Sequence, residues 1–256
     1  GREGCFHHAL PSRYSMARIS TSIPGPLAKA SFLRRVNRFL LQVRLEDMDE
    51  TIEAHMADPG RLEELLIRGK WVWLRPASNP NRKTKWSAVL VESPDGGVLI
   101  SLDTTLPNRL IGRALQAHAL PELSGWSLVR REVTLGRSRF DFLLAREDGC
   151  QMALEVKSVT LVEDGIGLFP DAITARGARH VSELMEISRN RGWEAAVLFV
   201  LQRPDAAEIR AAERIDPVFA RALLEAQKAG VRVLGRRCHV FSDRVELGDA
   251  VPARAG

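Results

Sequence analysis

Two apolar runs with charged residues embedded in them constrain the fold of this chain more than any other feature. Residues 139–145 contain Asp141, and residues 152–161 contain Glu155 and Lys157. A short polar stretch ending in glycine joins the runs and is typical of a turn. We therefore expect two antiparallel strands. Glu155 and Lys157 are two residues apart and share one face of their strand, so Asp141 should lie beside them.

Two carboxylates and an amine at neighbouring strand positions suit metal-assisted cleavage of a phosphodiester. Asp141 and Glu155 are the expected ligands of Mg²⁺ or Mn²⁺, and Glu132 and the carbonyl of Val156 are further candidates. Lys157 would orient the attacking hydroxide or offset charge on the phosphate. A solvated face of an edge strand is the alternative, although charges within apolar strands are costly unless they are paired or metal-bound.

Length and composition exclude several classes of protein. The 256 residues, 45% of them hydrophobic, suffice for one large domain or two ordinary ones. No apolar run approaches the roughly 20 residues of a membrane span. Cys5, Cys150 and Cys238 lack zinc-site spacing, which favours a reducing cytoplasm. Residues 1–15 have no secretory pattern and read as a disordered or extension segment. No feature of the sequence indicates the oligomeric state.

The net charge of +5 favours a polyanionic partner, and the basic residues are clustered. The residues expected to contact DNA are Arg35, Arg38, Arg82, Lys83, Lys85, Arg109, Arg137, Arg139, Arg176 and Arg179. Any one cluster could be an ordinary solvated face, but neutralising phosphates requires several cations together. The chain has neither a Walker loop nor a helix-turn-helix pattern. We therefore expect DNA binding that is not sequence-specific.

Residues 16–104 are predicted to form a small β-barrel of the oligonucleotide-binding (OB) type. Strands are expected within 27–45 (two strands) and at 51–56, 71–75, 86–92 and 98–102, with a short helix at 61–67. A sandwich or an SH3-like barrel would fit almost as well. Trp71, Trp73 and Trp86 could stack on bases, but such residues more often belong to a barrel core.

Residues 105–256 are predicted to form an α/β sandwich around a mixed sheet. Helices are expected at 107–119, 171–189 and 216–229, and strands at 126–135, 139–145, 152–161, 194–202, 231–234 and 237–241. The apolar run 195–201 predicts a buried central strand. Asp171 should be a helix N-cap, and Gln202, at the end of the central strand, is a weak candidate for a position near the metal.

The order of these elements, with Asp on the second strand and Glu-x-Lys on the third, resembles the PD-(D/E)xK nuclease superfamily. Ten strings resemble the sugar fermentation stimulation protein A family and cover about residues 20 to 250. They are Asp58-Pro-Gly-Arg61, Asn79-Pro-Asn-Arg-Lys-Thr84, Asp103-Thr-Thr-Leu-Pro-Asn-Arg109, Pro121-Glu-Leu-Ser-Gly125, Arg130-Arg-Glu-Val133, Ser138-Arg-Phe-Asp-Phe142, Leu154-Glu-Val-Lys-Ser-Val-Thr160, Phe169-Pro-Asp-Ala172, Thr174-Ala-Arg-Gly177 and Ile215-Asp-Pro217.

This resemblance implies an OB-like domain, a restriction-endonuclease-like domain, and DNA binding linked to the regulation of sugar (maltose) fermentation. Asp141, Glu155 and Lys157 match the nuclease motif. Two departures are visible. The loop at 56–62 differs from the Cys-Pro-Asn-Thr-Gly-Ser-Met that members often carry. The helix before the first strand lacks the expected Glu, so a further carboxylate must be Glu122 or Glu132, or be absent.

Two other functions remain open at this stage. One is a DNA-binding module without catalysis, in which Asp141, Glu155 and Lys157 form an unused scaffold. The other is a regulator that handles RNA or a small molecule.

Overall fold

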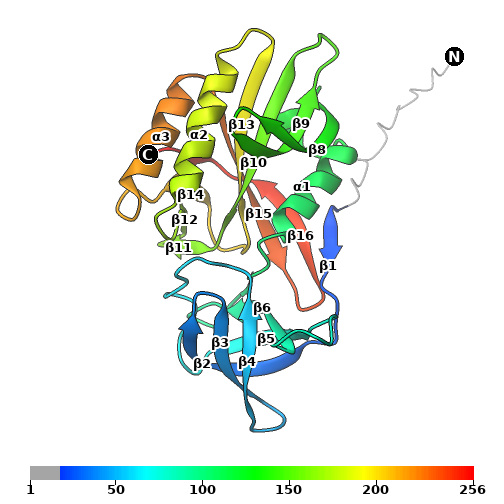
Figure 1. The fold of residues 1–256 in the computed structure, drawn as a ribbon, viewed down its shortest axis with the longest axis vertical. Coiled ribbons are helices and arrows are strands. Elements are labelled where there is room, and N and C mark those ends of the chain that lie inside the picture. The colour runs from blue at the N-terminus through cyan, green and yellow to red at the C-terminus, as the bar shows by residue number, and fades with distance from the viewer. Residues whose placement is uncertain (1–17) are drawn as a thin grey trace, which may run out of the picture.

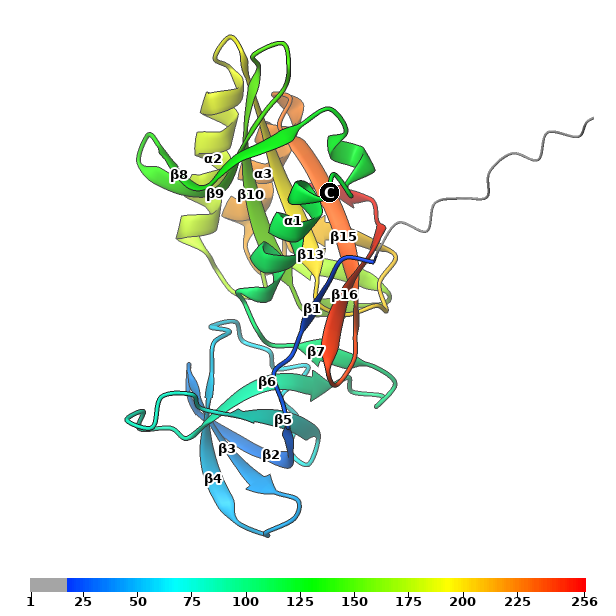
Figure 2. The ribbon, with the colours of Figure 1, turned by 90° about the vertical axis from the view of Figure 1, so that its right-hand side faces the viewer.

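The computed structural model describes residues 18–256, so the expected extension at 1–15 lies outside the described residues. A β-barrel and an α/β part are stacked along the long axis of the molecule (Figure 1). Figure 2 shows that β1 (Ser20–Ser22) lies beside the last long strand of the α/β part before the chain enters the barrel. The segment that precedes the barrel therefore belongs to the sheet of the other part.

The barrel is the expected OB-like barrel. Its strands are β2 (Ala28–Asn37), β3 (Leu40–Leu45), β4 (Thr51–Met56), β5 (Trp71–Pro76), β6 (Trp86–Glu92) and β7 (Leu99–Ser101). They are ordered β4-β3-β2-β5-β6-β7, and a parallel pairing of β4 with β6 closes the barrel. Alternate residues such as Leu41 and Val43 point into its core and are fully buried, as the period of a strand requires.

The predicted helix at 61–67 is wrong. A single turn forms there, in which the N–H groups of Leu65 and Leu66 donate to the carbonyl of Leu62. Leu62 has a φ of 52°, in the left-handed region, so a right-handed helix does not extend through this residue. Leu62 and Leu65 are instead fully buried in the barrel core. Burial of these two leucines outweighs the helical pattern of the segment.

The α/β part contains a mixed seven-stranded sheet, as expected. Its strands are β8 (Ser127–Leu135), β9 (Ser138–Ala145), β10 (Gln151–Val159), β13 (Trp193–Leu201), β15 (Arg232–Val240), β16 (Arg244–Ala250) and β1. The order is β1-β16-β15-β13-β10-β9-β8, and β13 runs parallel to both of its neighbours. The run predicted as a central strand is therefore β13, which is almost entirely buried.

Helices cover both faces of this sheet (Figure 1). Helix α1 (Leu106–Gln116) packs on one face, and α2 (Ala175–Ser188) and α3 (Pro217–Lys228) pack on the other. A 3₁₀ turn follows α1 at Pro121–Leu123. The remaining elements form a small sheet of four strands. They are β11 (Leu161–Glu163), β12 (Ile166–Phe169), β14 (Glu208–Ala211) and β17 (Ala253–Arg254).

Several predicted boundaries need correction. The strand predicted at 152–161 ends at Val159, and the chain continues into the small sheet. The two strands predicted at 231–234 and 237–241 are one strand, β15, which begins after Val231. Residues 235 and 236, between the two predicted strands, also pair with β13, so the strand is not interrupted. Helix α2 begins at Ala175, and Thr174 is its N-cap, with Oγ1 accepting from the N–H of Gly177. Asp171 is therefore not the helix N-cap.

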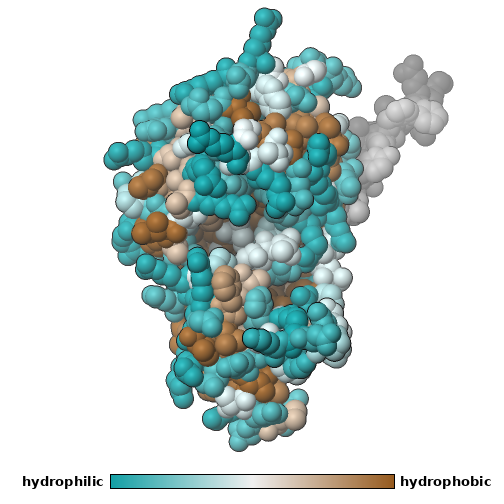
Figure 3. Space-filling view, in the orientation of Figure 1, coloured by the Kyte–Doolittle hydropathy of each residue, from teal (hydrophilic) through white to brown (hydrophobic). Residues whose placement is uncertain are grey.

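The face of the molecule drawn in Figure 3 is mostly hydrophilic. Figure 3 shows hydrophobic patches that are separate from one another on the face it displays. Within residues 18–256, no helix has the length and apolar character needed to span a membrane.

Candidate active site

The pairing of β9 with β10 brings Asp141 to Glu155 and Lys157. The two strands are antiparallel, and Leu154 pairs with Phe142, so Asp141 follows on the same ladder as Glu155. The N–H of Val156 donates to Asp141 Oδ2 at 2.7 Å, and Lys157 Nζ donates to Glu155 Oε1 at 2.6 Å. The three residue types singled out by the sequence thus meet at one point of the sheet.

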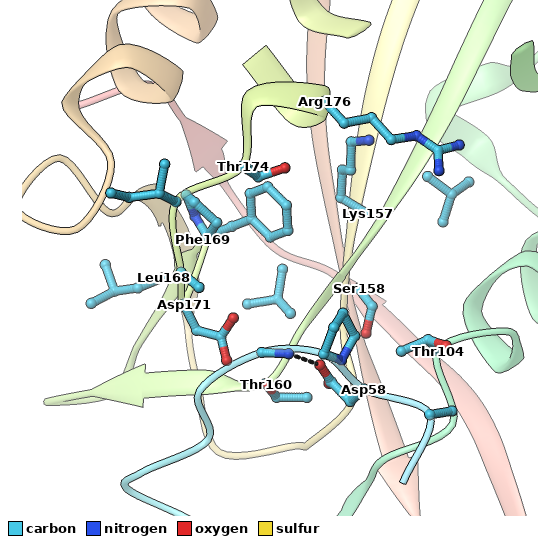
Figure 4. A pocket seen from close by; sticks show the side chains of 18 of the residues that line it. Asp58, Thr104, Lys157, Ser158, Thr160, Leu168, Phe169, Asp171, Thr174 and Arg176 are labelled. Atoms are coloured by element: carbon cyan, nitrogen blue, oxygen red, sulfur yellow. Dashed lines mark hydrogen bonds between the residues drawn. The ribbon is translucent and has the colours of Figure 1, made fainter. Parts of the chain in front are cut away.

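These side chains line a cleft of about 560 Å³ between the barrel and the α/β part. Strand β10, the beginning of α1 around Thr104, the segment 168–174 and the barrel loop 57–60 all contribute to its walls. In Figure 4, the loop with Asp58 crosses one end of the cleft, and Lys157 and Arg176 lie towards the other. The catalytic candidates therefore face a cleft with one wall supplied by the barrel.

Glu155 is the most constrained carboxylate of the cleft. It is 5% exposed, and its Oε1 contacts both Lys157 Nζ and His180 Nδ1, the latter at 2.7 Å. Its Oε2 is buried and has no hydrogen-bond partner among the described residues. Burial alone would raise the pKa of Glu155, but the hydrogen bond with His180 and the charge of Lys157 outweigh it and lower the pKa. Glu155 is therefore ionised at neutral pH, with one oxygen free.

His180 is a site residue that sequence reasoning did not connect with Glu155. It lies on the buried face of α2 and is 2% exposed. Arg176 Nε donates to His180 Nε2 at 3.4 Å, which leaves Nδ1 to carry the proton donated to Glu155. The only signal in the sequence was the helical spacing of 176 and 180, which places the two side chains one turn apart.

Asp141 is destabilised in its charged form. Burial, followed by the negative charge of Glu155, raises the pKa of Asp141 to about 6. Asn108, near the beginning of α1, donates from Nδ2 to Asp141 Oδ1 at 2.6 Å and partly offsets this effect. Asn108 was also missed, although it lies within one of the family-like strings. Two carboxylates this close favour a cation between them.

The donor set fits a hard divalent cation. Glu155 supplies a buried oxygen that no group of residues 18–256 hydrogen-bonds, and a positive ion beside Asp141 would remove the electrostatic cost of its charge. Across residues 18–256, no three His, Cys, Asp or Glu side chains gather in a metal-binding cluster. Mg²⁺ is commonly held by one or two carboxylates with water completing its shell. Two carboxylates are therefore sufficient for such an ion.

Three other carboxylate or amide candidates have partners other than Asp141 and Glu155. Glu132 has a side chain that is 66% exposed and lies 3.9 Å from Arg139; its φ of 53° interrupts the regular path of β8. Glu122 forms a two-fold hydrogen bond with Arg236. Gln202 Nε2 donates to the carbonyl of Asp103 and to Ser158 Oγ. Glu132 is thus opposite Asp141 in the pairing of β8 with β9, but its exposed side chain contacts Arg139, and Glu122 and Gln202 are engaged with other partners.

Asp171 fixes the barrel loop that forms one wall of the cleft. The N–H of Leu62 donates to Asp171 Oδ2 at 3.4 Å, and a Cβ at Gly60 would lie 2.2 Å from this carboxylate. Only glycine allows such a close approach. Asp58 accepts from the N–H of Gly60, and burial raises the pKa of Asp58 to about 6. The contact of Asp171 with Gly60 and Leu62 joins the barrel to the α/β part.

The expected DNA contacts are spread over several surfaces, and only Arg38 and Arg176 line the cleft. Arg35 instead donates to the carbonyls of Gly60 and Arg61 and so stabilises the barrel loop. The others lie elsewhere. Arg109 pairs with Asp103, and Arg139 pairs with Glu132. The loop between β5 and β6 contains Arg82, Lys83 and Lys85. Arg137 lies in the turn between β8 and β9, and Arg179 is exposed on α2.

Comparisons with known proteins confirm the resemblance and the fold class. The family description "Sugar fermentation stimulation protein RE domain" matches residues 105–244, and "SfsA N-terminal OB domain" matches residues 33–101. The sugar fermentation stimulation protein homolog of Moorella thermoacetica is 47% identical over 88% of this chain and 95% of that protein. The homolog of Shouchella clausii is 44% identical over 89% and 97%.

A solved structure is also similar over nearly the whole chain. It is the Pyrococcus furiosus SfsA protein in complex with Ca²⁺, with a TM-score of 0.81 and 29% sequence identity. The similarity covers 93% of this chain and 99% of the other. The barrel and the α/β part therefore occur together in a protein of the same architecture.

Proposed function

The chain belongs to the sugar fermentation stimulation protein family, and we propose that it is a DNA-binding protein whose α/β part cleaves phosphodiester bonds with Mg²⁺ or Mn²⁺. The observation that carries this proposal is the state of Glu155. Its Oε1 is held by Lys157 and His180, its buried Oε2 has no hydrogen-bond partner within residues 18–256, and its charge raises the pKa of Asp141. A divalent cation and a phosphate would satisfy this arrangement.

Each residue of the site has a distinct part in the proposed chemistry. Asp141 and Glu155 would hold the cation, which supplies Lewis acidity and an ionised water. Lys157, with a side chain only 13% exposed, would offset negative charge on the phosphate. Arg176, at the beginning of α2, and Arg38, on the barrel, would hold the flanking phosphates of the DNA. The Pyrococcus protein is in complex with Ca²⁺, a cation that prefers oxygen ligands, which supports divalent-cation binding by this chain.

A second candidate is a DNA-binding protein without catalysis. Lys157 and Glu155 form an ion pair, and His180 adds a hydrogen bond to the same carboxylate oxygen. Such a network could be retained in a nuclease scaffold that no longer cleaves. Under both candidates the protein acts on DNA, which would explain the association of the family with sugar fermentation through gene regulation. Both candidates would also place the protein in the cytoplasm.

The decisive experiment incubates the purified protein with labelled single-stranded, duplex and branched DNA in the presence of Mg²⁺, Mn²⁺ or EDTA. We expect cleavage that requires the metal and is lost in Glu155→Ala, while binding in EDTA persists. Binding of wild-type protein without cleavage under every metal condition would favour the second candidate. No binding to any of the three substrates would reject both.

His180 should act as a positioning residue for Glu155. Replacing His180 with alanine is expected to weaken Mn²⁺ affinity roughly 10- to 100-fold, because hydrogen-bond partners of metal ligands commonly have effects of this size. His180→Asn retains a donor near the position of Nδ1 and should recover most of the affinity. Isothermal titration of Mn²⁺ without DNA measures both. Equal losses in the two variants would assign His180 a packing role only.

A further inference from the structure

The hairpin turn between β2 and β3 carries a cation that lines the cleft and, next to it, an exposed aromatic ring. Asn37 pairs with Leu40, so the turn consists of Arg38 and Phe39 alone. Arg38 lines the cleft, and Phe39 is 44% exposed. An exposed phenylalanine at the tip of a hairpin contributes little to the barrel core, and a single such residue is ordinary, so its neighbours decide what it could bind.

Phe39 is stacked on a second ring. The rings of Phe39 and His55 are 6.4 Å apart between centroids and only 14° from parallel. The Arg38 guanidinium lies 5.8 Å from the Phe39 ring. Burial and the charge of Arg82 lower the pKa of His55, so its ring is neutral at pH 7. The two rings are therefore nearly parallel and uncharged, and the Arg38 cation lies over the Phe39 ring.

Arg82 lies close to the second of these rings. His55 is opposite Ser87 in the pairing of β4 with β6, and Arg82 Nη1 donates to Ser87 Oγ at 3.1 Å. The hydrogen bonds of Arg82 and Arg38 within the described residues go only to neutral oxygens. Their charges therefore remain available for phosphate groups.

The tryptophans that the sequence suggested for base stacking are placed differently. Trp73 packs against the hydrophobic core of the α/β part, and Trp86 packs against the barrel core. Trp71 carries the Lys29 ammonium 4.0 Å from its ring centre. The stacked pair of Phe39 and His55 is instead next to a cleft residue, because Phe39 follows Arg38 in the turn.

We infer that Arg38, Phe39, His55 and Arg82 form a binding platform for single-stranded DNA. An unpaired base stacks on Phe39, while Arg38 and Arg82 contact the phosphates on either side. In a duplex the bases stack on their own neighbours, so this surface selects an unpaired segment. The same DNA strand would continue past Arg38 into the cleft. The inference rests on the proposed function, and it specifies the substrate as DNA with a single-stranded region.

The test compares the binding of a fluorescently labelled oligothymidylate with that of a duplex of equal length, by fluorescence anisotropy in EDTA. Phe39→Ala should raise the Kd for the single strand roughly tenfold or more, because stacking on one base has an effect of this order. Its Kd for the duplex should change less than about twofold. Phe39→Trp should restore single-strand affinity. Met48→Ala is the matched control, since Met48 is 67% exposed on the turn between β3 and β4.

The outcomes separate this inference from the proposed nuclease function. If Phe39→Ala leaves single-strand binding unchanged, or weakens both substrates equally, the platform does not exist, whereas metal-dependent cleavage by the wild-type protein would still establish the nuclease. If the wild-type protein binds neither substrate, both the platform and the DNA-binding proposal fail. Selective loss in Phe39→Ala with rescue by Phe39→Trp supports the platform whether or not the protein cleaves.

Discussion

Replacing Lys157 with methionine is expected to lower the rate of metal-dependent DNA cleavage by about 10²- to 10³-fold, the usual effect of removing one group that stabilises transition-state charge. Lys157 Nζ lies 2.6 Å from Glu155 Oε1 and faces the cleft. Methionine keeps much of the side-chain volume but removes the charge. Single-turnover cleavage at saturating Mn²⁺ measures the change in the chemical step.

Two comparisons show whether the loss arises from Lys157 itself. DNA affinity in EDTA should stay within about twofold of the wild-type value, because Arg38 and Arg176 still line the cleft. Lys228→Met, in the last turn of α3, removes an exposed lysine remote from the cleft and should leave the rate unchanged. A Lys157→Met enzyme with the wild-type rate would mean that Lys157 serves only as the ion-pair partner of Glu155.

The meeting of Asp141 with Glu155 followed from the sequence because it depends on local pairing. The two strands are joined by a short turn, so register alone determines which residues are neighbours. His180 and Asn108 could not be placed in the same way. Each lies on a helix that the sequence predicted. The helical period shows which side chains are buried, but it does not show which of them contacts a carboxylate on the sheet.

Contacts between the barrel and the α/β part were the least predictable. Asp171 and Leu62 are 109 positions apart, and neither their spacing nor their residue types indicate that they meet. The left-handed backbone of Leu62, which removed the predicted helix, belongs to the same loop. Strand β16 was missed because its sequence contains no apolar run. It is a strand because it pairs with β15 and β1.

Replacing Asp141 with asparagine should raise the free energy of unfolding of the metal-free protein by about 2 kcal/mol at pH 7.5, even though it abolishes cleavage. Burial and the charge of Glu155 raise the pKa of Asp141 to about 6 from an ordinary value of 3.8. The new amide carries no charge, keeps an oxygen to accept from the N–H of Val156, and can donate to the side-chain oxygen of Asn108 once that amide is flipped. Urea denaturation in EDTA measures the difference between the two proteins.

The pH dependence of this difference follows from proton linkage. The folded wild-type protein binds more protons at Asp141 than the unfolded chain between about pH 4 and pH 6, so its stability falls as the pH rises through that interval. The advantage of Asp141→Asn should therefore be near zero below pH 4 and complete above pH 6. Asp58 also has a pKa of about 6, but it is present in both proteins and cancels. Asp47→Asn, on an exposed turn, serves as the control.

Divalent metal should reverse the order of stability. A cation held by Asp141 and Glu155 stabilises the folded wild-type protein in proportion to the logarithm of its concentration above the Kd, and Asp141→Asn lacks one of the two ligands. Excess Mn²⁺ should therefore raise the Tm of the wild-type protein and leave that of the variant almost unchanged. A variant that is less stable than wild type in EDTA at pH 7.5 would contradict this account. In that case Lys157 and Asn108 would already stabilise the charge of Asp141, and a metal would not be required to offset repulsion between the two carboxylates.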